Sequence, residues 1–96
     1  MKKYKEVLQK SMAKYVRNLR GSLSQEEMAE ALHVSTRAYG DLERGEHFLS
    51  GMTLVFLILF IHKHDDKKGT EIRHFLKVLE ESVQKAEKAA EEESPS

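Results

Sequence analysis

The chain has 96 residues, which is enough for one hydrophobic core and too few for two. It contains no cysteine, so a disulfide scaffold and thiol chemistry are excluded, and its 16 basic residues balance its 16 acidic ones. Because the net charge is zero, only the distribution of charge along the chain can indicate a nucleic-acid partner. No apolar run follows the first six residues, as a secretory signal would require, and we expect a protein of the reducing cytoplasm.

The first twenty residues predict a helix over about 3–20, which Gly21-Ser22 would end. Its apolar residues recur at helical spacing: Tyr4, Leu8, Met12, Tyr15, Val16 and Leu19. This segment holds seven basic residues against Glu6, whereas residues 80–93 hold six glutamates against two lysines. Two interpretations stay open. Either these clusters give the domain a polarised surface, or both are simply the solvated faces of helices.

A second, short helix is predicted directly after Ser24. The Ser24 side chain can cap the amide of Glu27, and Glu27 can reach back to the Ser24 amide, which makes a capping box. Met28, Ala29 and Leu32 form the apolar stripe of this helix. Ala29 is small where a neighbouring helix must cross closely.

A third helix is predicted after a tight turn at His33-Val34. Ser35 is a good N-cap, the helix would run to about Arg44, and Gly45 would end it. Its inward-facing residues are expected to be Ala38, Tyr39 and Leu42. When two short helices are packed at a steep angle, one of them can be held against DNA by the other.

Residues 54–61 are eight consecutive apolar residues, too few to span a bilayer. They predict a fourth helix from about Met52 to His62 or His64, capped by Ser50, although composition alone also allows a buried β-strand. A helix without a polar face cannot lie on the surface of a monomer. It therefore needs a second cover, which is either the last helix of its own chain or a partner subunit.

The last helix is predicted over about 71–92, capped by Thr70 after a turn at 65–69. Its apolar residues alternate by four and three, as in a helix–helix seam: Ile72, Leu76, Leu79, Val83, Ala86 and Ala90. This seam can lie on the fourth helix of its own chain or on a partner. Residues 94–96 are expected to form a disordered tail.

The residues Leu-Ser-Gln-Glu-Glu-Met-Ala-Glu-Ala-Leu at 23–32, Val-Ser at 34–35 and Leu-Glu-Arg-Gly at 42–45 resemble the helix-turn-helix regulators of the lambda-repressor/Cro type. The resemblance covers about residues 12–60. It implies a lambda-repressor-like DNA-binding domain, whereas no motif covers the last third of the chain. From the resemblance together with the helical spacing, we expect an all-α, five-helix fold, with a DNA-binding domain over 1–64 and a C-terminal helix over 65–93 for packing or dimerisation. Two positions depart from the family pattern: His33 replaces the usual glycine of the turn, and Tyr39-Gly40-Asp41 replaces an aliphatic, a serine and a basic or amide residue.

The resemblance also implies which residues meet DNA. Thr36 and Arg37 would lie at the exposed first turn of the recognition helix, where Arg37 could read guanine, and Asp41 one turn further could accept from cytosine. The alternative for Asp41 is an intramolecular pair with Arg37. The expected phosphate contacts are Ser24, Gln25, Arg44 and Arg17. Glu43 is polar within the matching motif, and the sequence assigns it no role.

A metal site is the other chemistry that the sequence raises. The candidate ligands are His62, His64, Asp65, Asp66 and His74. The i, i+2 spacing puts His62 and His64 on different faces of a helix, and no thiolate is present, so we expect neither a metal nor a cofactor. No nucleophile elbow or glycine-rich phosphate loop is present either, and an enzyme is not expected.

The sequence thus predicts a homodimer that binds double-stranded DNA at a pseudo-palindromic operator and represses or regulates transcription. The alternative is a protein-interaction module, such as an antitoxin-like or structural subunit with a protein partner, that keeps the fold but binds DNA weakly. The expected dimer interface comprises Val55, Phe56, Ile58, Leu59, Leu76, Leu79 and Val83. An all-apolar run does not show which of its sides faces outward.

Overall fold

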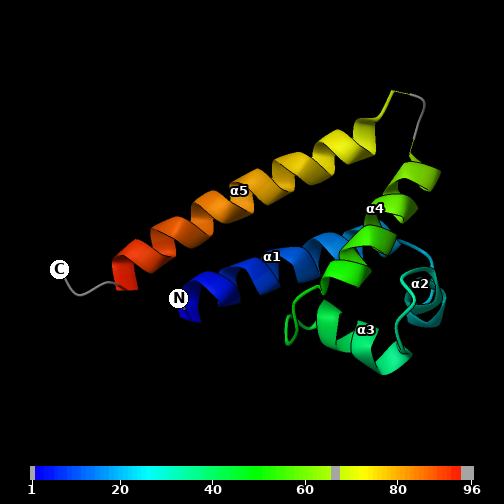
Figure 1. The fold of residues 1–96 in the computed structure, drawn as a ribbon, viewed down its shortest axis with the longest axis horizontal. Helices are drawn as coiled ribbons and strands as arrows, with labels where there is room; N and C mark the ends of the chain where they lie inside the picture. Colours follow the sequence, from blue (N-terminus) through cyan, green and yellow to red (C-terminus); the bar gives the residue numbers. More distant parts are fainter. Residues whose placement is uncertain (1, 66–67, 94–96) are drawn as a thin grey trace.

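The computed structural model describes residues 2–65 and 68–93, and these residues form five α-helices and no strand (Figure 1). The helices are α1 (Lys2–Arg20), α2 (Gln25–Ala31), α3 (Thr36–Glu43), α4 (Gly51–His64) and α5 (Thr70–Glu93). The all-α, five-helix prediction is therefore confirmed, and the β-strand alternative for 54–61 is wrong. The expected tail at 94–96 lies outside the described residues, as does part of the turn at 65–69.

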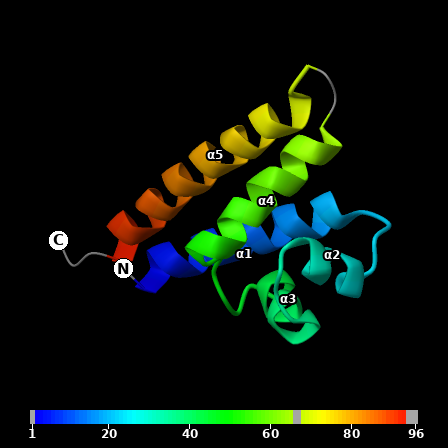
Figure 2. The ribbon, with the colours of Figure 1, turned by 45° about the vertical axis from the view of Figure 1, so that its right-hand side comes forward.

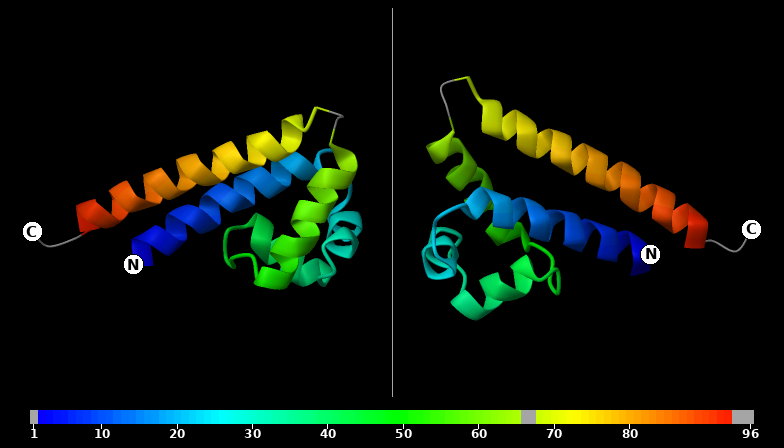
Figure 3. Two further views of the ribbon diagram at one scale, coloured as in Figure 1. Left: turned by 45° about the horizontal axis from the view of Figure 1, so that its top comes forward. Right: turned by 180° about the vertical axis from the view of Figure 1, so that it is seen from behind.

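Helices α1 and α5 lie antiparallel along one another, while α2 and α3 lie beside one end of α1 (Figures 1 and 3). Helix α4 crosses α1 at a steep angle, and its end lies near the start of α5 (Figure 2). Because α1 and α5 are antiparallel, the basic start of α1 lies near the acidic end of α5. Only the first part of the basic segment is a neighbour of the acidic cluster, because Arg17 and Arg20 lie in the last turn of α1.

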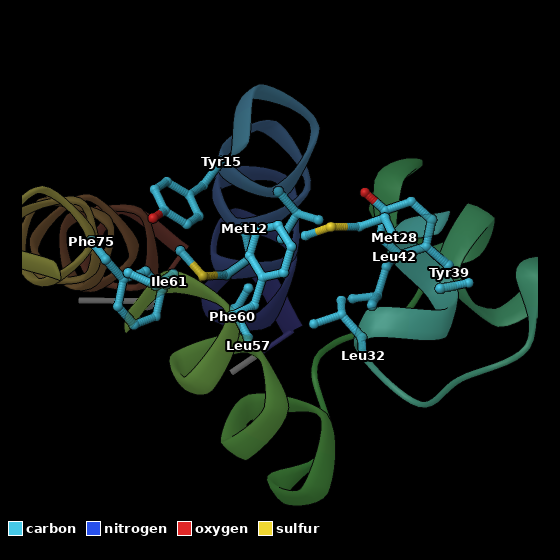
Figure 4. Packing of buried hydrophobic residues seen from close by; sticks show 12 residues of the cluster. Met12, Tyr15, Met28, Leu32, Tyr39, Leu42, Leu57, Phe60, Ile61 and Phe75 are labelled. Carbon is cyan, nitrogen blue, oxygen red and sulfur yellow. The ribbon is translucent and has the colours of Figure 1, made fainter. Parts of the chain in front are cut away.

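Side chains from all five helices meet in one core (Figure 4). Its largest fully buried members are Tyr39, Phe75, Met12, Met28, Leu32, Leu57, Ile61 and Val16. Those from the first three helices belong to the apolar stripes that the sequence predicts, Leu57 and Ile61 belong to the apolar run at 54–61, and Phe75 lies in α5. Ala38 is the exception, because it is exposed while Tyr39 and Leu42 beside it are buried.

The predicted N-caps of the second, third and fourth helices are confirmed. The Glu27 amide donates to Ser24 Oγ at 3.0 Å, and the Ser24 amide donates to Glu27 Oε1 at 3.0 Å, which completes the capping box. Ser35 accepts from the Ala38 amide at the start of α3, and Ser50 accepts from the amide of Thr53 at the start of α4. These bonds satisfy amides that have no partner inside their own helix.

The predictions for the last helix need two corrections. Thr70 is the first residue of α5, and the Asp65 carboxylate accepts from the amides of Glu71 and Ile72 at 2.7 and 3.1 Å. The helix also lies mainly on α1, not on α4. Its buried face follows Phe75, Ser82 and Ala86, of which only Ala86 belongs to the predicted seam. Ile72, Leu79 and Val83 of the seam are partly buried, whereas Leu76 is 57% exposed.

Helix α4 has a buried side and an exposed apolar side, although its sequence shows neither. Leu57, Phe60 and Ile61 are buried, as is Thr53. The large exposed residues are Met52, Val55, Ile58 and Leu59. Within the described residues, no helix is both long enough and apolar enough to cross a membrane.

Candidate nucleic-acid interface

Helices α2 and α3 are joined by a turn that depends on an unusual backbone angle. His33 has a φ of +58°, in the left-handed region that glycine normally occupies. The next amide, that of Val34, donates to the Ala29 carbonyl at 3.0 Å. Ala29 is almost fully buried, in agreement with a close crossing at this small residue. Histidine thus adopts the left-handed conformation at this turn.

The outward side of α3 carries a line of charged residues. Arg37, Asp41 and Arg44 follow one another at i, i+4 and i+7, while Tyr39 and Leu42 face the core. Thr36 and Arg37 are both exposed at the first turn of α3, as predicted. The three charged side chains therefore stand on the side of the helix that a duplex could approach.

Asp41 does not pair with Arg37, so that alternative is wrong. Its Oδ1 accepts from Arg44 Nη2, and Arg44 Nε donates to Glu46 Oε1 at 3.3 Å. The ring of His47 lies beside the same carboxylate, with Nε2 3.6 Å from Asp41 Oδ2. Among the described residues, two carboxylates therefore neutralise the charge of Arg44, whereas none is paired with Arg37.

Glu43, to which the sequence assigned no role, is the centre of a buried polar network. Its side chain is only 5% exposed, and its Oε2 accepts from Arg20 Nε at 2.5 Å. Oε1 accepts from Arg20 Nη2 at 3.2 Å and from Gln25 Nε2 at 2.9 Å, and the Tyr39 hydroxyl donates to Oε2. One carboxylate thus ties α1, α2 and α3 together beneath the outward side of α3.

The ionisation of this network follows from its contacts. Burial by itself would raise the pKa of the Glu43 carboxyl, but hydrogen bonds from Arg20, Tyr39 and Gln25 outweigh it and hold that pKa below its ordinary value. Burial, together with the neighbouring Glu43 carboxylate, raises the pKa of the Tyr39 phenol. Glu43 therefore remains an anion and Tyr39 a donor at neutral pH.

A signal for Glu43 is present in the sequence. Tyr39, Leu42 and Glu43 stand at i, i+3 and i+4, so the glutamate occupies a core position of the apolar stripe. A glutamate is almost never fully buried unless it is paired. Its partners Arg20 and Gln25 are 23 and 18 residues away, and only the packing of the helices identifies them.

The other expected phosphate contacts lie around the same junction. Arg17 is exposed and donates from Nη1 to the Glu43 carbonyl at 2.7 Å, which places its guanidinium at the end of α3. Gln25 and Ser24 are exposed at the start of α2. The structure therefore brings Arg17, Gln25 and Ser24 to the border of the outward side of α3, although Gln25 and Arg17 already make intramolecular bonds.

The candidate metal ligands do not come together in the structure. Among residues 2–65 and 68–93, no group of three or more such side chains could hold an ion, and Asp66 lies outside the described residues. The His64 ring packs on Phe60 with 4.3 Å between centroids, and Nδ1 is 3.1 Å from the Phe60 carbonyl oxygen. The His74 ring lies 5.9 Å from that of Tyr15.

The geometry agrees with the comparison to known families. Residues 14–60 match the family model described as helix-turn-helix. The match begins in the second half of α1, includes all of α2 and α3, and ends near the end of α4, leaving α5 outside. No curated protein and no solved structure matches the chain.

Proposed function

Because residues 14–60 belong to the lambda-repressor type of helix-turn-helix family, whose members are DNA-binding regulators of transcription and not enzymes, we propose that this protein is a homodimeric regulator that recognises a specific operator. Helix α3 would enter the major groove, where base pairs present distinct patterns of donors and acceptors. The bound protein would repress transcription by occupying the operator. It would act in the cytoplasm.

We assign the recognition of DNA bases to the outward side of α3. Thr36 and Arg37 stand exposed at the first turn, which is the part of a recognition helix that meets base edges. Arg37 makes no ion pair among the described residues, so its planar fork is available for guanine O6 and N7. Asp41 extends this line by one turn. The observation that carries the proposal is this exposed line, held in place by the buried Glu43 network.

Ser24, Gln25 and Arg17 are proposed as contacts to the phosphate backbone. Contacts of this kind set the position of the protein on the duplex and carry no sequence information of their own. Arg17 supplies a positive charge at the end of α3, and Ser24 and Gln25 supply polar groups at the start of α2. All three border the proposed reading surface.

The homodimer is proposed from the exposed apolar side of α4. Val55, Ile58 and Leu59 are 51%, 40% and 54% exposed, and Leu76 of α5 is also exposed. The remaining residues of the predicted interface, Phe56, Leu79 and Val83, are only partly exposed. Pairing of two such surfaces about a two-fold axis would place two α3 helices in successive major grooves, about 34–36 Å apart.

One observation favours the alternative of a protein-interaction module with a protein partner. The outward side of α3 together with the nearby Glu46 carries no net charge, because the two carboxylates that bind Arg44 equal in number the guanidinium groups of Arg37 and Arg44. Phosphate attraction dominates non-specific affinity for DNA, so a neutral surface weakens that contribution.

A selection experiment tests the proposal. The full chain is incubated with a library of random-sequence duplexes at low salt, and the bound DNA is recovered over several rounds. We expect enrichment of a sequence with two inverted half-sites about one helical turn apart. Recovery of no preferred sequence, together with no gel shift on any duplex at low salt, would exclude the DNA-binding function and favour the interaction module.

A further inference from the structure

The Arg44 side chain folds back across the outward side of α3. Arg44 follows the last residue of the helix, and its guanidinium reaches Asp41, three residues earlier. It lies directly over Gly40, where a Cβ atom would come within 3.1 Å of Nη1 and 3.9 Å of Cζ. A Cβ at position 40 would therefore press on the guanidinium, which would have to shift by a few tenths of an ångström.

The hydrogen bonds of this guanidinium leave one of its donor edges open. A guanidinium has five N–H donors, and two carboxylates use the side formed by Nε and Nη2. The end formed by Nη1 and the second N–H of Nη2 has no acceptor among the described residues. The side chain of Arg44 is 56% exposed, whereas that of Asp41 is 19% exposed, so Arg44 is the more accessible of the two partners. Nη1 is the guanidinium atom nearest to a Cβ at Gly40, and Nη2 lies further from it.

We propose that Arg44 reads a guanine, that Asp41 and Glu46 are positioning residues that hold its guanidinium, and that Gly40 lets the guanidinium lie close against α3. The inference rests on the proposed DNA-binding function and deepens it. A guanine presents two acceptors, O6 and N7, that match two parallel N–H groups of arginine. An arginine already fixed by carboxylates loses less conformational freedom when it binds, because its fork is preorganised.

The same arrangement accounts for two features that otherwise weaken the site. Gly40 is unfavourable inside a helix, and Asp41 brings negative charge to a surface that approaches phosphates. Both become useful if their task is to hold Arg44 flat on α3. Arg44 then differs from the expected phosphate contact, since it acts on one base pair and not on every sequence alike.

The first experiment replaces Arg44 with lysine, which keeps the charge and removes the fork. Affinities of the full-length wild type and Arg44→Lys are measured on the selected operator and on every single-base variant of one half-site. We expect the wild type to require a G·C pair at one position, and Arg44→Lys to lower the preference there by about 5- to 150-fold. Preferences at the other positions should stay unchanged.

The second experiment separates positioning from direct contact. If Asp41 acts through Arg44, Asp41→Asn should weaken the preference at the same base pair as Arg44→Lys, and the double variant should lose little more. If Asp41 itself contacts a base, its variant should change the preference at a different base pair. That second result would overturn the positioning role.

The third experiment tests the space at position 40 with a matched glycine. Gly40→Ala should raise the melting temperature, because alanine favours the helix, and yet weaken the preference for the same G·C pair. Gly51→Ala is the control, because a Cβ at Gly51 meets nothing within 4 Å. It should leave the whole profile unchanged.

The outcomes for the proposal are distinct. An equal loss of affinity on all sequences for Arg44→Lys would make Arg44 a phosphate contact, and an unchanged profile would give it no reading role. Either result overturns this inference and leaves the proposed DNA binding intact. A wild type that prefers no sequence overturns both.

Discussion

The guanidinium of Arg20 donates from Nε to Glu43 Oε2 at 2.5 Å and from Nη2 to Oε1 at 3.2 Å, and so joins the last residue of α1 to the last residue of α3. This bidentate pair is largely buried, with the two side chains 24% and 5% exposed. Bidentate arginine–carboxylate pairs fix orientation as well as distance. The pair therefore sets the direction in which α3 presents its outward side.

The first prediction concerns the stability that this pair provides. Glu43→Gln should lower the free energy of unfolding by about 3 kcal/mol, the low end of the range for a broken buried ion pair, because Arg20 keeps some contact with water. Urea unfolding followed by circular dichroism measures it. Glu80→Gln, on the exposed side of α5, is the matched control and should change stability by less than about 0.5 kcal/mol. A similar value for both variants would contradict the structural role of Glu43.

The second prediction is a dependence of stability on pH. Since the pKa of the Glu43 carboxyl is lower in the folded protein than in the unfolded chain, the carboxylate stabilises the fold above the ordinary glutamate range, about pH 4.3. This contribution is lost as the pH falls through the folded pKa. The difference in stability between wild type and Glu43→Gln should therefore shrink below about pH 4. A difference that stays constant from pH 7 to pH 3 would be inconsistent with an ionised Glu43.

The third prediction assigns base reading to Arg37. Arg37→Ala should cost about 1–3 kcal/mol at one position of each half-site and relax the preference there. Affinities across a panel of single-base operator variants give the profile. If the profile keeps its shape, Arg37 is not a reader.

The fourth prediction concerns the backbone contacts. Arg17→Ala and Gln25→Ala should weaken binding to all duplexes alike, and loss of Arg17 should also reduce the salt dependence by about one phosphate. The logarithm of the affinity is measured against the logarithm of the salt concentration. Lys77→Ala on α5 is the control and should leave this slope unchanged. A loss restricted to the selected operator would argue against backbone contacts.

The fifth prediction tests self-association through α4. Burial of an exposed leucine or phenylalanine contributes roughly 1.5–3 kcal/mol, so a few such side chains on each subunit could hold a micromolar dimer. Val55→Lys should therefore give a folded monomer with much weaker operator binding. Gln84→Lys, an added lysine on the exposed side of α5, should remain dimeric. Sedimentation measures both, and a wild type that is monomeric at tens of micromolar without DNA would refute the dimer.

The sequence by itself determined the number of helices, their order and most of their ends. Caps such as Ser24, Ser35 and Ser50 act on amides three residues away, and helical periodicity depends on residues three and four apart. Both kinds of interaction join residues within one helical turn of each other, so the amino-acid sequence alone shows their pattern. The residues at 23–45 that suggest a helix-turn-helix are local in the same sense.

Only the tertiary structure decided what depends on distant partners. The sequence assigned Glu43 no role because its partners on α1 and α2 are far away in the chain. Asp41 pairs with Arg44 and not with Arg37, and the Arg44 side chain folds back over Gly40 to reach it. An all-apolar α4 shows no preferred side, and the broad apolar stripe of α5 allows several lines of contact. The choice of one side for each helix came from packing on α1 and the rest of the core, where side chains from distant segments are buried together.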